Sequence, residues 1–148
     1  MNYLVAKARD LAHRAHARQV DKAGRPYIEH VARVAAAVSD DPEAEAVAWL
    51  HDVIEDCPDY HDEVSDSFPM HILLPVNKIT RWNWVNGDLL PFYYAEIRAN
   101  PVALRVKLAD IADNADEARL GLLDEKTANR LRRKYAKAIA ALNGKEVL

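Results

Sequence analysis

The sequence contains a single cysteine, Cys57, and therefore cannot form an internal disulfide. This scarcity is typical of proteins in a reducing compartment, and we expect a cytoplasmic protein. Because no apolar run approaches about 18 residues, no membrane-spanning segment is predicted. The first twelve residues also show no signal-peptide pattern. The net charge of only −3 disfavours nucleic-acid binding driven by bulk charge.

Alanine is absent between Trp49 and Tyr94, whereas both flanks are rich in it. Because alanine is the best helix former, the flanks are predicted to be closely packed helices, and the middle to consist of shorter helices and loops. Half of the residues are hydrophobic, which excludes a disordered chain. Glycine- or serine-rich linkers, repeats and low-complexity tracts are lacking, so we expect one domain over residues 1–148.

Helical spacing of apolar residues and helix-start signals predict an all-α fold. Asp41–Pro42 and Asn100–Pro101 each place a capping residue before a proline in the first helical position. Gly121 is predicted to end the helix that Pro101 begins. No segment shows the two-residue alternation of apolar and polar side chains that is typical of a β-strand. The predicted helices span 3–19, 27–38, 42–56, 59–67, 70–79, 88–99, 101–120 and 125–142, with a loop at 82–87.

One turn at the end of the predicted 42–56 helix combines His51 with three carboxylates, Asp52, Glu55 and Asp56. These carboxylates repel each other, and the dipole at a helix C-terminus adds to the penalty. A bound cation would make the arrangement favourable. The alternative is an exposed acidic helix end beside an ordinary core histidine.

Asp110 lies within an apolar stretch of the predicted 101–120 helix. A buried carboxylate needs a charged or hydrogen-bonding partner. Asn114 lies one turn further along, and Lys107 lies nearly one turn before. A Lys107–Asp110 pair at the surface is the simple alternative, whereas a shared cation would satisfy both Asp110 and the acidic turn.

His30, near the start of the 27–38 helix, is a third candidate ligand. Together with His51, Asp52 and Asp110 it would give two imidazoles and two carboxylates from three helices, forming a single metal site between helices. Mixed nitrogen and oxygen ligands suit manganese, iron or zinc better than calcium. Such a centre could support metal-assisted hydrolysis. The remaining histidines are interpreted as ordinary core or surface residues: His13, His16, His61 and His71.

These residues lie in segments that resemble the HD-domain metal-dependent phosphohydrolases. The segments are most similar to the hydrolase domain of the RelA/SpoT-type alarmone enzymes and to the free-standing small alarmone hydrolases. The resemblance implies an HD-domain helical bundle that removes the 3′-diphosphate from guanosine tetra- or pentaphosphate, usually with manganese. It covers residues 8–120 through the segments 15–19, 22–30, 49–56, 79–80 and 106–114.

The resemblance also implies roles for individual positions. Glu55 and Asp56 match an acidic pair that orients or deprotonates the attacking water. The metal would be ligated by His30, His51, Asp52 and Asp110. The substrate would be contacted by Lys22 in a basic loop, by Asn114, and by Arg81 as a phosphate contact.

The sequence departs from the family at Asp21, where an arginine usually packs against the guanine base. A carboxylate cannot stack in that way and repels phosphates, so the departure argues against the guanine recognition and alarmone specificity of the family. Arg18 and Arg25 are candidates to compensate. This departure supports the alternative of an HD phosphohydrolase acting on another nucleotide or phosphoester.

A non-enzymatic alternative is a nucleotide-binding or protein-interaction module on the same scaffold, although the complete set of candidate ligands argues against it. The basic run at residues 130–134 is interpreted as a solvated helix face. Trp82 and Trp84 are interpreted as loop packing or as a contact in a homodimer.

Overall fold

The computed structural model describes residues 2–145. Within this range the regular elements are helices, and an isolated bridge joins Val20 to Pro26, which confirms the predicted all-α fold. The elements are α1 (Tyr3–Ala15), α2 (Tyr27–Ala37), α3 (Pro42–Leu50), α4 (Val53–Asp56), the 3₁₀ turn η1 (Pro58–Tyr60), α5 (His61–Ser67), α6 (Met70–Ile79), α7 (Leu90–Arg98), α8 (Pro101–Asn114), α9 (Glu117–Leu120) and α10 (Glu125–Leu142).

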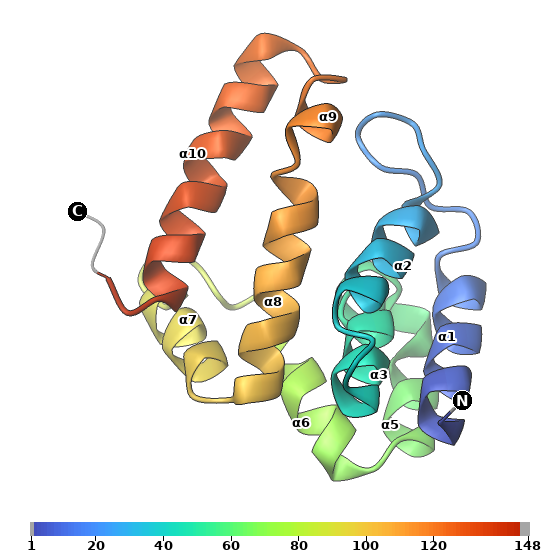
Figure 1. The fold of residues 1–148 in the computed structure, drawn as a ribbon. Coiled ribbons are helices and arrows are strands. Elements are labelled where there is room, and N and C mark those ends of the chain that lie inside the picture. The colour runs from blue at the N-terminus through green and yellow to red at the C-terminus, as the bar shows by residue number, and fades with distance from the viewer. Residues whose placement is uncertain (1, 146–148) are drawn as a thin grey trace.

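Helix α3 is the centre of the core and packs against α1, α2, α6 and α8. Its residues from Ala44 onward are buried except for Glu45, and three of them are alanines. These small side chains allow the neighbouring helices to approach closely. Figure 1 shows α1, α2, α3, α5 and α6 on one side and α7 to α10 on the other, with α8 between α10 and the α2–α3 pair. In the described part of the chain, no helix is long and apolar enough to cross a membrane.

The prediction of one helix over 42–56 is wrong, because the helix is interrupted at His51 and Asp52. The structure has α3 before this break and α4 after it. The Ala48 carbonyl oxygen lies 2.6 Å from His51 Nδ1 and also accepts the His51 backbone N–H at 3.4 Å. This side-chain contact with the backbone holds the imidazole against the end of α3. The break places His51 and Asp52 at the junction between α3 and α4 and not within one continuous helix.

The helix predicted over 101–120 is also interrupted, at Ala115 and Asp116. The Asp116 side chain accepts the Ala118 N–H at 2.8 Å and so caps a new short helix, α9. Another boundary differs as well, because α1 ends at Ala15 and not at residue 19. In Figure 1 the loop between α1 and α2 lies at the same end of the molecule as α9.

Candidate metal centre

Four side chains from the α2, α3–α4 and α8 region converge on one point. One ligand atom from each of them lies within 4.8 Å of all the others. Asp110 Oδ1 is 3.1 Å from His30 Nε2 and 3.3 Å from His51 Nε2, while Asp52 Oδ2 is 3.0 Å from His51 Nε2. These are the residues expected as ligands from the sequence, and both imidazoles are buried.

The other ring nitrogen of each histidine is already held from outside the cluster. His30 Nδ1 is 2.6 Å from Asp113 Oδ2, and His51 Nδ1 is 2.6 Å from the Ala48 carbonyl oxygen. Histidines that bind metals hold the second nitrogen in this way, which fixes the tautomer and orients the ring. Both Nε2 atoms are therefore available to a cation, and the donor set fits a divalent transition metal.

Asp110 has further partners on its own helix. Its Oδ2 accepts Lys107 Nζ at 3.1 Å, and its Oδ1 accepts Asn114 Nδ2 at 3.1 Å. The Lys107–Asp110 pair therefore forms, but the Asp110 side chain is only 7% exposed, so the pair is not a surface feature. Lys107 occupies one carboxylate oxygen while the other faces both imidazoles. Asn114, expected to contact substrate, here contacts a candidate metal ligand.

Asp52 is held by a residue that the sequence did not indicate. The Tyr27 hydroxyl donates to Asp52 Oδ2 at 2.5 Å, and the tyrosine ring lies against His30 and His16. Although burial raises it, the charge of His51 and the bond from Tyr27 lower the pKa of Asp52. The carboxylate is therefore kept in the ionised form that a metal ligand requires.

The cluster is electrostatically arranged to attract positive charge. Although burial lowers the pKa of both imidazoles, Asp110 and Asp113 raise that of His30, and Asp52 and Asp110 raise that of His51. The pKa of Asp110 lies well below its usual value because Lys107 and His51 outweigh its burial. The negative carboxylates therefore favour protonated imidazoles at this position, and a bound cation would neutralise the same carboxylates.

The acidic pair of α4 lies beside this cluster. Burial makes the largest contribution to the raised pKa of both Glu55 and Asp56. The negative charge of Asp52 raises both pKa values further. Asp56 Oδ2 accepts Gln19 Nε2 at 3.0 Å, and Gln19 Oε1 lies 2.7 Å from His16 Nδ1. The buried His16, which the sequence analysis treated as ordinary, thus orients the amide that holds Asp56.

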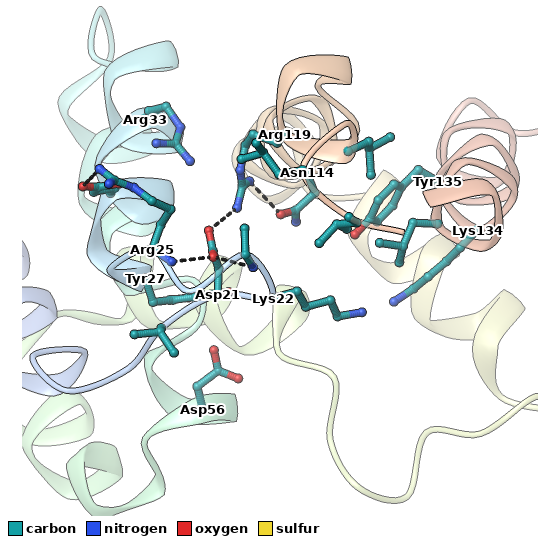
Figure 2. Close-up of a pocket in the computed structure, with 17 residues that line it drawn as sticks. Asp21, Lys22, Arg25, Tyr27, Arg33, Asp56, Asn114, Arg119, Lys134 and Tyr135 are labelled. Carbon is teal, nitrogen blue, oxygen red and sulfur yellow. Dashed lines mark hydrogen bonds and ion pairs between the residues drawn. The ribbon is translucent and has the colours of Figure 1, made fainter. Parts of the chain in front are cut away.

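A cavity of about 670 Å³ opens next to Asp56, and we call it the loop cavity. It lies between the loop after α1 and the helices α9 and α10, and Asp21, Lys22 and Asn114 line it. In Figure 2 the Lys22 side chain points across the opening toward Lys134 of α10. The structure thus puts two of the three expected substrate residues at this cavity.

Asp21 is bound by an arginine from α9. Arg119 Nη2 is 3.1 Å from Asp21 Oδ2 (Figure 2), and Arg119 Nη1 is 2.7 Å from Asp113 Oδ2. Although burial raises it, hydrogen bonds from the Arg25 backbone N–H and from Arg119 lower the pKa of Asp21. Arg25 itself pairs with Glu29 at 2.8 Å. The structure therefore brings the guanidinium of Arg119 next to Asp21 at the loop cavity, a residue that sequence reasoning missed.

Arg81 lies apart from the loop cavity. Its backbone N–H donates to Glu55 Oε2 at 3.3 Å, while the residue lines a neighbouring cavity between α7 and α10. The loop that follows it agrees with the prediction for 82–87. Trp82 packs against the core and the His61 ring, whereas Trp84 is exposed.

Comparison with known proteins supports the assignment of the fold. No protein-family model matches the chain. The chain is similar in structure to a metazoan orthologue of SpoT that hydrolyses ppGpp and plays a role in starvation responses. The two superpose with a TM-score of 0.80 over 99% of this chain and 89% of that one, at 22% sequence identity. This similarity confirms the HD-domain fold, with a buried histidine and aspartate cluster between the helices.

Proposed function

We propose that the protein is a manganese-dependent phosphohydrolase that removes the 3′-diphosphate from guanosine tetra- or pentaphosphate in the cytoplasm. One observation carries this proposal: four ligand atoms converge within 4.8 Å, beside an acidic pair and a cavity with basic residues. The similarity to a ppGpp-hydrolysing protein over almost the whole chain supports the choice of substrate.

His30, His51, Asp52 and Asp110 would hold the ion. When bound, a divalent ion supplies Lewis-acid polarisation of a phosphate oxygen and lowers the pKa of water. Asp113 and the Ala48 carbonyl keep the two imidazoles aligned, and Tyr27 keeps Asp52 aligned. The chain's own contacts therefore orient three of the four candidate ligands.

Glu55 and Asp56 would act on the attacking water. One carboxylate accepts a proton from the water as its oxygen bonds to the phosphorus next to the 3′ oxygen. The bond between that phosphorus and the 3′ oxygen breaks, pyrophosphate leaves, and a proton ends on the 3′ oxygen. The raised pKa of both carboxyls makes each of them a stronger proton acceptor than an ordinary surface carboxylate. Gln19 holds Asp56 in place during this step.

The loop cavity would hold the nucleoside. Lys22 would offset phosphate charge at the mouth of the cavity. Arg119 is fixed by Asp21, Asp113 and Asn114, so its guanidinium plane is held rigidly and can stack on a base. In this arrangement Asp21 does not contact the base but holds the arginine that does.

Product analysis tests the proposal. Guanosine tetraphosphate is incubated with the protein and manganese, and the products are separated by anion-exchange chromatography. We expect equal amounts of GDP and pyrophosphate, abolished by Asp110→Asn and unaffected by Asp62→Asn, a substitution at an exposed acid on α5. Cleavage of other phosphoesters without pyrophosphate release would refute the substrate and favour an HD phosphohydrolase for another nucleotide. If the wild-type protein hydrolyses none of these substrates and Asp110→Asn leaves the metal content unchanged, a non-enzymatic module would be favoured.

A further inference from the structure

A second cavity, of about 760 Å³, lies between α7 and the C-terminal half of α10, and we call it the basic cavity. Five cationic residues line it and none of its lining residues is acidic, although the whole chain carries a net charge of −3. Within residues 2–145, none of the five takes part in an ion pair within 4.0 Å. The cationic residues are Arg81, Arg98, Lys134, Lys137 and Lys145.

The end of α10 helps to shape this cavity. Gly144 adopts a positive φ of 76°, so that its N–H donates to Ala141 and the Lys145 N–H donates to Ala140. This is a glycine-terminated helix end, and a Cβ at Gly144 would lie 3.9 Å from Arg98 Cδ of α7. The Arg98 guanidinium donates to the Ala141 carbonyl at 2.8 Å, which fixes one arginine at the edge of the cavity. A backbone contact therefore positions one of the five cations, Arg98.

The basic cavity adjoins the candidate catalytic site. Lys134 lines both cavities, and the backbone of Arg81 contacts Glu55. Partial burial, followed by repulsion from Lys107, Lys22 and Arg81, lowers the pKa of Lys134. Of these three cations, Arg81 lines the basic cavity together with Lys134, and Lys22 lines the loop cavity.

We propose that the basic cavity is a second anion-binding site that takes a diphosphate group. Lys137 and Lys134, on the same helix, and Arg98 facing them from α7 would supply charge-assisted hydrogen bonds to its oxygens. The diphosphate could come from the far end of the bound nucleotide or from free pyrophosphate. The site itself rests on the cavity alone, whereas the first of these sources also rests on the proposed function.

Binding is tested by titrating the ¹⁵N-labelled protein with inorganic pyrophosphate and following backbone amide resonances. We expect saturable shifts at Tyr94, Ala138 and Ala141, which line the basic cavity. Lys137→Glu should weaken this binding by about tenfold or more, because a cation is replaced by an anion. The matched control is Lys126→Glu, at an exposed site in the first turn of the same helix and outside both cavities, which should bind as the wild type does.

Kinetics distinguish the two sources. If the cavity holds the distal end of the nucleotide, Lys137→Glu raises KM for guanosine tetraphosphate by about tenfold. If the cavity holds free pyrophosphate, KM stays unchanged and the inhibition constant for pyrophosphate rises instead. The absence of amide shifts at the cavity, or equal binding by Lys137→Glu and the wild type, would overturn the proposal. The titration needs no turnover, so it decides this point even if the chain does not hydrolyse guanosine tetraphosphate.

Discussion

Asp113→Asn should weaken metal binding although Asp113 does not belong to the four-ligand cluster. The Asp113 carboxylate accepts His30 Nδ1 at 2.6 Å and also binds Arg33 and Arg119, each at 2.7 Å. Its side chain is only 14% exposed, so solvent screens these contacts little. Although burial raises it, the hydrogen bonds from His30 and Arg33 lower the pKa of Asp113 to about 2, and the group is ionised at neutral pH.

The expected magnitude follows from the hydrogen bond to His30. A hydrogen bond to a charged group contributes about 1.5–3 kcal/mol. Loss of a partner that orients a metal-ligating histidine typically costs about 10- to 100-fold in metal affinity, or about 1.4–2.7 kcal/mol. An asparagine keeps the size of the side chain but loses the charge that aligns the ring and raises its basicity. We therefore expect the manganese Kd to rise by about 10- to 100-fold.

The assay is a manganese titration followed by the electron paramagnetic resonance signal of the free ion. The control is Arg33→Ala, which removes one donor to Asp113 but keeps the His30 contact. Because Arg33 is half-exposed, this variant should change the Kd by no more than about threefold. A Kd for Asp113→Asn within about twofold of the wild type would refute the view that Asp113 orients His30 for a metal.

Three further predictions concern the same site. Manganese at about 100 times its Kd should raise the melting temperature by roughly 5–10 °C, and differential scanning calorimetry should show no such rise for Asp110→Asn. Glu55→Gln should lower kcat by about 10²- to 10⁴-fold and retain manganese binding, because it removes a proton acceptor and not a metal ligand. Unchanged turnover in a pyrophosphate-release assay would contradict the role of Glu55 as a proton acceptor. Arg119→Ala should raise KM for guanosine tetraphosphate by about tenfold with little change in kcat. The control, Arg18→Ala, changes an exposed residue outside both cavities and should leave KM unchanged. Equal effects of the two substitutions would argue against base stacking by Arg119.

The all-α fold could be predicted because its signals are local. Capping residues before prolines mark the starts of α3 and α8, and apolar spacing marks the buried faces. The interruptions at His51 and Asp116 were missed because each depends on one side chain that bonds to the backbone. Such bonds compete with a continuing helix, and periodicity does not report them.

The candidate ligands could be predicted because their charges conflict with their surroundings. Asp110 in an apolar stretch and the crowded acids after His51 both required a partner. The positioning residues were harder to find, since His30 and Asp113 lie 83 positions apart in the chain. Asp113 does lie one helical turn after Asp110, and that spacing was the available signal. Arg119 could not be predicted as a site residue because its contact with Asp21 depends on the break at Asp116, after which α9 lies beside the loop that carries Asp21.

The central claim is that His30, His51, Asp52 and Asp110 form one metal centre. The most direct test is anomalous diffraction from crystals of the protein grown with manganese. We expect a single strong anomalous peak at about 2.0–2.3 Å from the His30 and His51 Nε2 atoms and from one oxygen of each aspartate. A fully occupied peak elsewhere, or no peak at this cluster in crystals saturated with manganese, would contradict it.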